Sequence, residues 1–325
     1  MDIISNVVSL CSATLFVVLL DLIVAMVIKL GGGKFKKSFK RGLWATLLPS
    51  LLWCYGTFIE RNIYRINEVS LYSQNLPASF DGYKIVQISD IHLASFKGRN
   101  KSLQRAVNKI NSQQPDLILV TGDLITIGPW ELDGGLQEIL SKLNAKDGVY
   151  TILGNHDFCA YGKWESKNEQ KEALNHLKTR ISQMGWRLLS NSNVVLSRAE
   201  SDTISLIGID NISQNRHFRS YGDLNKAMIG VSGSFKILMS HDPSFWRAEI
   251  VAPKTDIDLT LSGHTHAMQF SLFGWSPSSL LFDEYRGLYS EKEQFLYVNI
   301  GLGETFFKAR VGATPEITVL NLLKK

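Results

Sequence analysis

Cysteine is scarce in this sequence, with three residues in 325. Cys11 and Cys54 lie in apolar N-terminal segments, and Cys159 stands alone in the rest of the chain. That part therefore cannot form a disulfide within itself, and it lacks the thiolates that are typical of structural zinc sites. The sequence also contains no internal repeat and no low-complexity segment.

A large excess of charge of one sign is also missing, because the formal net charge is only +5. Much of this charge comes from one cluster of five basic residues near the N-terminus: Lys34, Lys36, Lys37, Lys40 and Arg41. No long basic stripe follows in the remaining chain, so we expect no nucleic-acid partner. The cluster lies between two apolar runs, and we interpret it as the flank of membrane segments.

The two apolar runs, residues 7–30 and 43–59, predict a membrane anchor over residues 1–60. The first run is long enough for a spanning helix, which needs about 20 residues, and it lacks the cleavage motif of a signal peptide. The second run is short and carries Pro49. We therefore expect the chain to be tethered at the inner or cytoplasmic membrane.

The side of the membrane depends on the second run. If it spans, the basic loop is cytoplasmic and the main domain is extracytoplasmic. If it lies in the interface, the main domain is cytoplasmic. We favour the first arrangement, because a basic loop between two apolar runs is typical of a helical hairpin.

After a polar linker with a short strand at residues 61–80, residues 81–325 predict one α/β domain. Apolar runs rich in β-branched residues indicate strands at 84–89, 116–121, 149–153, 203–209, 235–239, 256–261, 295–300 and 316–322. Apolar residues at helical spacing or charged runs indicate helices at 101–112, 132–143 and 165–184. Helices become rare in the second half, so we expect two stacked sheets flanked by helices.

Metal-binding residue types follow five of these expected strands. The segments are Asp90-Ile91-His92, Gly122-Asp123, Gly154-Asn155-His156-Asp157, Ser240-His241-Asp242 and Gly263-His264-Thr265-His266. Five of the 7 histidines fall in them. Strand ends of an open α/β sheet converge on one crevice, so we expect these side chains to form a cage for divalent metal ions. Mixed carboxylate, imidazole and amide ligands suit Mn²⁺, Fe or Zn²⁺ better than Ca²⁺.

Two adjacent metal ions suit phosphoryl chemistry. They hold a phosphoryl group between them and lower the pKa of a bound water to near neutrality, which gives a hydroxide nucleophile. A carboxylate that bridges the ions and a histidine that donates a proton to the leaving oxygen complete such a site.

In order and spacing, the five segments resemble those of the calcineurin-like metallophosphoesterases, over roughly residues 82–325. The stretches SHDPSFW, LSGHTHAMQ and YVNIGLG are similar to the bacterial membrane-anchored or exported subgroup. The resemblance implies an α/β fold of the four-layer α-β-β-α type, preceded here by the N-terminal helices. It also implies two divalent metal ions as cofactors, Mn, Fe or Zn.

Carried over residue by residue, the resemblance implies a role for eight side chains. Asp90, His92 and His266 hold the first metal, Asp123 bridges both metals, and Asn155, His241 and His264 hold the second. His156 is the catalytic residue, which contacts the phosphate and assists the leaving group.

Two further features bear on the site. Many family members have an Asp three residues after the bridging Asp, where it orients the catalytic histidine, but this chain has Thr126. Unless Thr126 or Asp157 takes over that function, we expect slower turnover rather than loss of metal. Arg216 and Arg219 lie in a polar stretch and are candidates for contacting a substrate phosphate, although a solvated loop explains them equally well.

The expected function is hydrolysis of a phosphodiester, phosphomonoester or pyrophosphate by a metal-bridging hydroxide, on a phosphorylated small molecule or a lipid-linked substrate. One alternative is a UDP-diacylglucosamine pyrophosphohydrolase of lipid A synthesis, which requires a cytoplasmic domain and an apolar groove. Candidates for lining such a groove, or for an ordinary core, are Leu272, Phe273, Trp275, Leu280, Leu281 and Phe282. A non-catalytic metal-binding scaffold is the further alternative. The natural substrate, the metals and the oligomeric state stay open.

Overall fold

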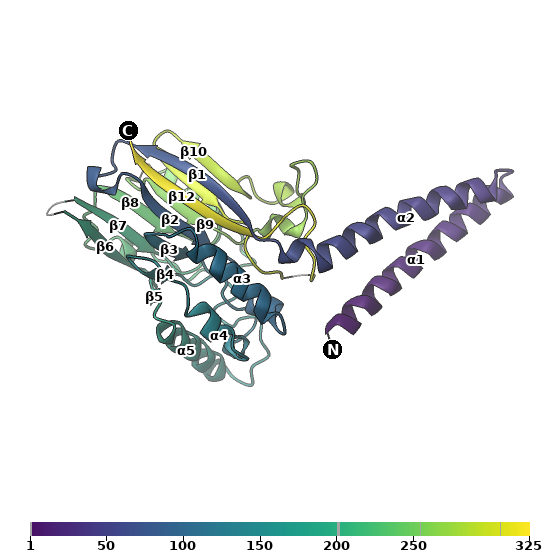
Figure 1. Cartoon of the computed structure of the whole chain (residues 1–325), viewed down its shortest axis with the longest axis horizontal. Helices are drawn as coiled ribbons and strands as arrows, with labels where there is room; N and C mark the ends of the chain where they lie inside the picture. Colours follow the sequence, from purple (N-terminus) through teal and green to yellow (C-terminus); the bar gives the residue numbers. More distant parts are fainter. Residues whose placement is uncertain (1, 200–201, 254, 306) are drawn as a thin grey trace.

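Strands in the described part of the computed structural model form two six-stranded sheets that pack face to face (Figure 1). The structure describes residues 2–199, 202–253, 255–305 and 307–325, and the side chains of residues 2–14, 16, 45 and 46 lie outside the description, Cys11 among them. Apolar side chains from both sheets fill the space between them, including Ile85, Leu119, Leu206 and Ile237. The expected α/β class with two stacked sheets is confirmed.

The first sheet carries three parallel strands that lead to the predicted site. Its order is β1 (Arg65–Ser73), β12 (Glu316–Lys324), β2 (Tyr83–Ile88), β3 (Leu117–Val120), β4 (Val149–Thr151) and β5 (Arg187–Leu188). Strands β2, β3, β4 and β5 run parallel, whereas β12 is antiparallel to β2. All residues of β3 are buried, which explains its continuous apolar sequence.

Helices α3 (Asn100–Asn111), α4 (Leu136–Leu140) and α5 (Lys167–Gln183) cover the outer face of the first sheet. Helix α3 buries Leu103, Val107 and Ile110, which recur at helical spacing. The helix expected at 132–143 is shorter, because Gly134 and Gly135 adopt φ values of 68° and 86° and prevent a continuous helix.

The second sheet supplies the other half of the site. Its order is β10 (Gly287–Glu291), β11 (Gln294–Val298), β9 (Leu259–Ser262), β8 (Phe235–Met239), β7 (Asp202–Gly208) and β6 (Ser192–Arg198). A short helix α6 (Leu224–Ala227) and a helical turn at Trp246–Val251 cover its outer face. The layers therefore follow the expected order of helices, sheet, sheet and helices.

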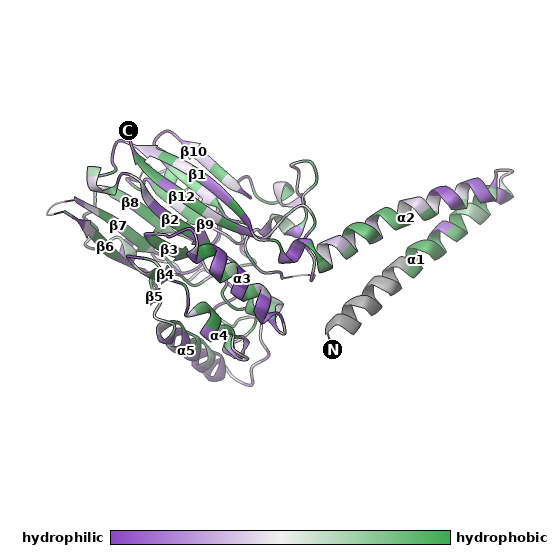
Figure 2. Ribbon diagram, in the orientation of Figure 1, coloured by the Kyte–Doolittle hydropathy of each residue, from purple (hydrophilic) through white to green (hydrophobic). Residues whose placement is uncertain are grey.

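Helices α1 (Asp2–Leu30) and α2 (Phe35–Phe58) form an antiparallel pair that projects from the domain (Figures 1 and 2). The second helix begins at Phe35 rather than near residue 43, because the basic cluster continues the helix instead of forming a loop. Lysine and arginine are good helix formers, and the glycines at 31–33 provide the connection. Among the described residues, one segment, Phe35–Asn62, is long and apolar enough to cross a membrane by length and composition.

Within residues 61–80, where a polar linker with a short strand was expected, the strand β1 belongs to the first sheet. Strand β1 pairs in parallel with β12 along its whole length, from Arg65 opposite Glu316 to Ser73 opposite Lys324. The strand has a largely polar sequence, because only every second side chain toward its end is buried. The domain therefore follows directly on α2.

Candidate active site

The predicted ligands lie on loops at the carboxyl ends of strands from both sheets. Strands β2, β3 and β4 of the first sheet lead to Asp90 and His92, to Asp123, and to Asn155 and His156. In the second sheet, β8 leads to His241, and β9 leads to His264 and His266. The structure brings all eight side chains together at one edge, as the convergence of strand ends requires.

The backbone at this edge is strained. Five of the predicted ligands adopt left-handed φ values, between 44° at His92 and 73° at His264. Such conformations are costly for residues other than glycine and cluster at functional sites. At Gly154 and Gly263 an added Cβ would collide with the carboxylates of Asp123 and Asp90. The glycines of the motifs are thus required for the close approach of the loops.

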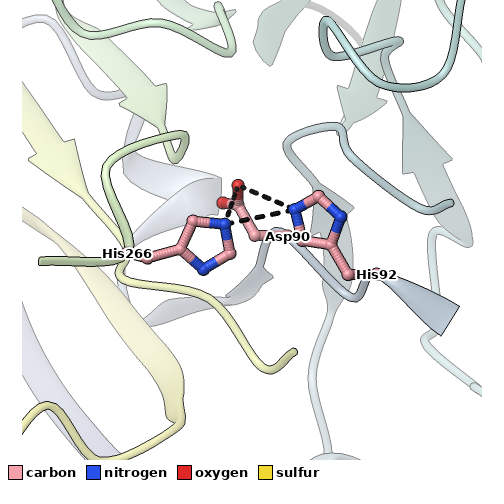
Figure 3. Close-up of side chains that lie close together, drawn as sticks. All are labelled: Asp90, His92 and His266. Atoms are coloured by element: carbon pink, nitrogen blue, oxygen red, sulfur yellow. Dashed lines mark hydrogen bonds and ion pairs between the residues drawn. The ribbon is translucent and has the colours of Figure 1, made fainter. Parts of the chain in front are cut away.

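Asp90, His92 and His266 form the first cluster, and their side chains point toward one another (Figure 3). The Nε2 atoms of His92 and His266 lie 3.1 Å apart, and Oδ1 of Asp90 lies 3.3 Å from Nε2 of His266 and 3.9 Å from Nε2 of His92. Ligands held about 2.1 Å from a shared ion stand about 3.0–3.4 Å apart. Two of the three separations fall in this range and the third, between Asp90 and His92, is longer at 3.9 Å, so the cluster is close to the spacing of ligands that share one metal ion.

Asp123, Asn155, His241 and His264 form the second cluster. Oδ2 of Asp123 lies 3.1 Å from Nε2 of His241, and Oδ1 of Asn155 lies 3.0 Å from Nδ1 of His264. Nε2 of His241 is buried and makes no hydrogen bond to described residues. A buried ring nitrogen that faces a carboxylate suits coordination of a metal ion. Oδ2 of Asp123 also lies 3.5 Å from Nε2 of His92, so this carboxylate stands between the two clusters.

The protonation of these groups also fits a metal centre. Burial lowers the pKa of His92 to about 3, which keeps its ring neutral and able to coordinate. Burial and the carboxylate of Asp123 raise the pKa of Asp90 to about 6. For His241, burial favours the neutral ring, but the carboxylates of Asp123 and Asp90 outweigh it and raise its pKa to about 10. The two carboxylates therefore attract a cation, and a divalent ion supplies that charge without a proton on His241.

His156 is oriented by a main-chain atom. Its Nδ1 lies 2.8 Å from the carbonyl oxygen of Thr126, and its main-chain N–H donates to Oδ1 of Asp123 at 2.9 Å. The Thr126 hydroxyl lies instead 3.3 Å from Nδ1 of His92. Thr126 thus provides, through its main chain, a hydrogen bond to His156 in place of the Asp that many family members have there. Asp157 does not make it, because its carboxylate accepts from the N–H groups of Ile125 and Gly154.

Glu131 supports this arrangement and was not recognised from the sequence. Its carboxylate accepts hydrogen bonds from the main-chain N–H groups of Ala94 and Thr126 at 2.8 Å each, and of Ile127 at 2.6 Å. It thereby joins the loop after His92 to the loop that orients His156. A glutamate on a polar 3-10 turn carries no sequence signal for such a role.

Asp242 and Tyr161 complete the surroundings of the second cluster. Oδ2 of Asp242 lies 3.5 Å from Nε2 of His264, the nitrogen that faces away from Asn155. Carboxylates in this position orient histidine ligands. The Tyr161 hydroxyl accepts a hydrogen bond from Nδ2 of Asn155 at 2.8 Å, and its ring stacks on His156 at 4.2 Å between centroids. The amide oxygen of Asn155 is thereby turned toward His264.

Arg216 and Arg219 lie on an exposed loop at the rim of the second cluster. Between them, the ring of Phe218 lies 4.6 Å from that of His264. The loop is therefore close to the site, and the two arginines remain candidates for contacting substrate.

Fold and site together define a metal-dependent hydrolase of phosphoric esters. Residues 83–268 match the family model of the calcineurin-like phosphoesterases, and the chain belongs to this family.

Similar proteins come from bacteria and vertebrates. The Bacillus subtilis metallophosphoesterase YkuE is 30% identical, over 88% of this chain and 97% of its own length. A transmembrane protein with a metallophosphoesterase domain from Danio rerio is 31% identical, over 86% of this chain and 62% of its own length. The UDP-2,3-diacylglucosamine pyrophosphatase LpxG of Chlamydia trachomatis is 29% identical, over 85% of this chain and 94% of its own length.

Proposed function

We propose that this phosphoesterase uses two metal ions and acts on a lipid-linked phosphoester or pyrophosphate at a membrane. The observation that supports the two-ion site is the position of Asp123, whose Oδ2 lies between His92 of the first cluster, at 3.5 Å, and His241 of the second, at 3.1 Å. Asp90, His92 and His266 would hold one ion, and Asn155, His241 and His264 the other. When bound, such a pair activates a water molecule near neutral pH and neutralises charge on the phosphoryl oxygens.

His156 is placed to transfer a proton. The Thr126 carbonyl can only accept a hydrogen bond, so Nδ1 of His156 carries the proton in their 2.8 Å contact. With Nδ1–H held by this carbonyl, Nε2 is the ring atom left to exchange a proton with the substrate. His156 is therefore suited to donate from Nε2 to the leaving oxygen.

Two observations support membrane association. Helix α2 is the candidate spanning segment, and the similar proteins from Danio rerio and Bos taurus are named transmembrane proteins. The basic residues of α2 lie toward the turn between the two helices, so the positive-inside rule favours an extracytoplasmic domain. A fusion of alkaline phosphatase to the C-terminus tests this topology, because alkaline phosphatase is active only outside the cytoplasm.

A UDP-diacylglucosamine pyrophosphatase is the second candidate, because LpxG has that name and covers most of this chain. This candidate requires a cytoplasmic domain, so an inactive alkaline phosphatase fusion would favour it.

The test of function is hydrolysis by the full chain in detergent with Mn²⁺. Bis-p-nitrophenyl phosphate, p-nitrophenyl phosphate and UDP-diacylglucosamine are compared, with Asp123→Ala as the control. We expect activity that depends on Asp123, and the preferred compound separates a diesterase from a pyrophosphatase. Activity that survives in Asp123→Ala, or that needs no metal, would contradict the proposal.

A further inference from the structure

A short apolar hairpin projects from the domain at residues 272–275. The main-chain groups of Leu272 and Trp275 bond to each other in both directions, at 2.8 and 3.0 Å. Phe273 and Gly274 form the tip with φ values of 50° and 89°. The Phe273 side chain is fully exposed, at 100%, and Trp275 and Leu272 are also exposed. Three of the residues expected to line a groove or a core, Leu272, Phe273 and Trp275, are therefore exposed.

The hairpin is held in this position by specific contacts. The Arg286 guanidinium donates to the Gly274 carbonyl at 2.9 Å and to the Ser271 hydroxyl at 3.0 Å. The Tyr285 hydroxyl donates to the same carbonyl at 3.2 Å. A bulky residue such as Phe273 rarely adopts a left-handed conformation, so its presentation costs energy. The structure thus holds an aromatic side chain in an exposed position, and exposed apolar side chains of this kind mark interaction sites.

Two more apolar side chains extend this surface. Leu280 and Leu281, at the end of the 3-10 turn Pro277–Leu280, are 75% and 68% exposed. We call the five side chains the apolar surface: Leu272, Phe273, Trp275, Leu280 and Leu281. Just beyond it, the ring of Phe282 lies 5.7 Å from that of His264. The apolar surface therefore extends to the rim of the second metal cluster.

The segment that carries the apolar surface is linked by main-chain hydrogen bonds to the end of α2 that joins the domain, and Figure 1 shows where α2 meets the domain. Ser271, next to the hairpin, donates its N–H to the Val311 carbonyl at 2.8 Å. The neighbouring Arg310 donates its N–H to the Gly56 carbonyl of α2 at 3.3 Å. An added Cβ at Gly56 would lie 2.7 Å from the Arg310 carbonyl oxygen, so helix and segment are in close contact. The Trp53 ring of α2 also contacts that of Phe307, at 5.0 Å.

The same end of α2 exposes further apolar side chains, among them Leu51, Phe58 and Ile59. Green ribbon marks the apolar stretches of this helix in Figure 2. Through residues 310 and 311, the segment that carries the hairpin is thus linked to an exposed apolar helix end. This continuity points to one occupant for both, because a bilayer around α2 reaches the side chains beside its end.

We propose that the apolar surface inserts into the boundary between headgroups and acyl chains of the bilayer that α2 crosses. Aromatic residues favour this depth, and apolar faces bury about 5–10 Å into it. The contact would turn the metal site toward the headgroups and select amphiphilic substrates whose phosphate lies there. This inference rests on the proposed membrane anchor and adds a second, specific contact to it.

The first test measures the depth of position 273 in the full chain, reconstituted into phosphatidylglycerol–phosphatidylcholine vesicles. A fluorophore is attached through Phe273→Cys in a background with Cys11→Ser and Cys54→Ser, while Cys159 stays buried. Leu48→Cys on α2 reports on the anchor. Ile229→Cys, 75% exposed beside β6 at the opposite edge of the second sheet, is the matched control.

We expect nitroxide-labelled lipids to quench the fluorophore at positions 273 and 48 but not at 229. Quenching at 48 without quenching at 273 would overturn the inference and leave the anchor intact. Absence of quenching at both positions would overturn the anchor as well. A blue-shifted but unquenched label at 273 would assign the surface to a second copy of the chain and would likewise overturn the inference.

The second test separates surface binding from catalysis. Phe273→Ser should leave the hydrolysis of bis-p-nitrophenyl phosphate in detergent unchanged, because residue 273 touches no metal ligand in the described structure. On UDP-diacylglucosamine in vesicles, kcat/KM should fall by about tenfold, the effect expected when one aromatic side chain loses its apolar contact. Ile229→Ser is the control. Equal rates for Phe273→Ser and wild type in vesicles would contradict the inference. If wild type hydrolyses neither bis-p-nitrophenyl phosphate nor UDP-diacylglucosamine, the proposed function would be contradicted instead.

Discussion

The active-site edge and the apolar surface depart from the normal pattern of burial in opposite ways. At the active site, charged and polar side chains such as Asp90, His92 and His241 are fully buried. At the apolar surface, Phe273 is fully exposed. Buried polar groups and exposed apolar patches are the informative exceptions in a folded protein. Each region suits a partner of a different kind: the first a cation, the second an apolar medium.

A second comparison separates carboxylates with and without a cation of their own. Asp116, at the amino end of β3, is also buried, but it contacts Lys146 at 2.7 Å and Arg198 at 3.1 Å. Within the described part of the chain, Asp90 and Asp123 form no ion pair with a lysine or arginine. Asp90 has a hydrogen bond with Ser89, and the buried Arg310 guanidinium acts on it only from beyond ion-pair distance. Acids of the same type therefore differ in function according to whether the protein supplies their positive charge.

The largest effect should come from Asp123→Ala. Asp123 lies between the two clusters, so its loss should strongly lower Mn²⁺-dependent turnover. Loss of a group that only hydrogen-bonds to a metal ligand costs about 10–100-fold, and we expect a larger decrease here. Metal analysis and the rate of hydrolysis measure this. Asp256→Ala removes a carboxylate that is 69% exposed and serves as the control. A variant that keeps two ions and full activity would show that Asp123 is not a bridging ligand.

Glu131→Gln should have the next largest effect. An amide cannot accept from all the N–H groups that the Glu131 carboxylate holds, so the Thr126 carbonyl and His156 should shift together. A displacement of about 1 Å can cost about 10²-fold in rate, and we expect kcat to fall while metal content stays unchanged. Steady-state kinetics beside Glu138→Gln, an exposed glutamate of α4, provide the comparison. Unchanged kcat would remove Glu131 from the positioning network.

Asp242→Asn should act mainly on the metal. The substitution keeps the size of the side chain but removes the negative charge beside Nε2 of His264. Affinity for the second ion should fall by about 10-fold, measured by titration with Mn²⁺ followed by activity. If affinity stays the same and only kcat falls, Asp242 acts on the substrate rather than on His264.

Thr126→Ala should have little effect, less than about threefold on kcat, because the carbonyl that binds His156 belongs to the main chain. The lost hydroxyl makes only the long 3.3 Å contact with His92. The pH profile of kcat should stay the same as well. A large decrease would mean that the side chain, rather than the carbonyl, replaces the family's Asp.

Asp116 should have the smallest effect, and one that depends on pH. Burial alone would raise its pKa, but Lys146, the Lys84 N–H and Arg198 hold it below the usual value. A lowered pKa stabilises the fold above the unfolded value of about 3.9, and this contribution is lost as the pH falls through the folded value. Asp116→Asn should therefore lower the free energy of unfolding by about 1 kcal/mol at pH 7 and by less near pH 3. Urea unfolding at both pH values measures the difference, and an equal loss at pH 3 would contradict the assignment.

The positions of the metal-binding residues could be predicted because each follows a buried apolar strand, and strand ends converge. Strand β3 and the following Gly122-Asp123 show this directly, since a continuous apolar run and a glycine are both visible in the sequence. The two stacked sheets were predicted from the same apolar runs. The start of α2 was predicted too late, because helix propensity carries the helix through charged residues that hydropathy excludes.

Other features depend on main-chain atoms or on distant partners, which residue types do not reveal. The carbonyl of Thr126 is present whatever the side chain, so its contact with His156 leaves no trace in the sequence. Glu131 joins two loops, at Ala94 and at Thr126, that are 32 residues apart in the sequence. No motif and no periodic pattern marks this connection. The hairpin at Phe273 was placed among groove or core candidates, because an apolar residue by itself does not show whether it is buried.

The most direct test is electron paramagnetic resonance of the full chain with two equivalents of Mn²⁺, compared with Asp123→Ala. If Asp123 belongs to both clusters, the two ions lie close enough to couple, and the wild-type spectrum should show an exchange-coupled pair that disappears in the variant. A spectrum of isolated Mn²⁺ ions in the wild type, or the same coupled signal in Asp123→Ala, would contradict a shared two-metal site.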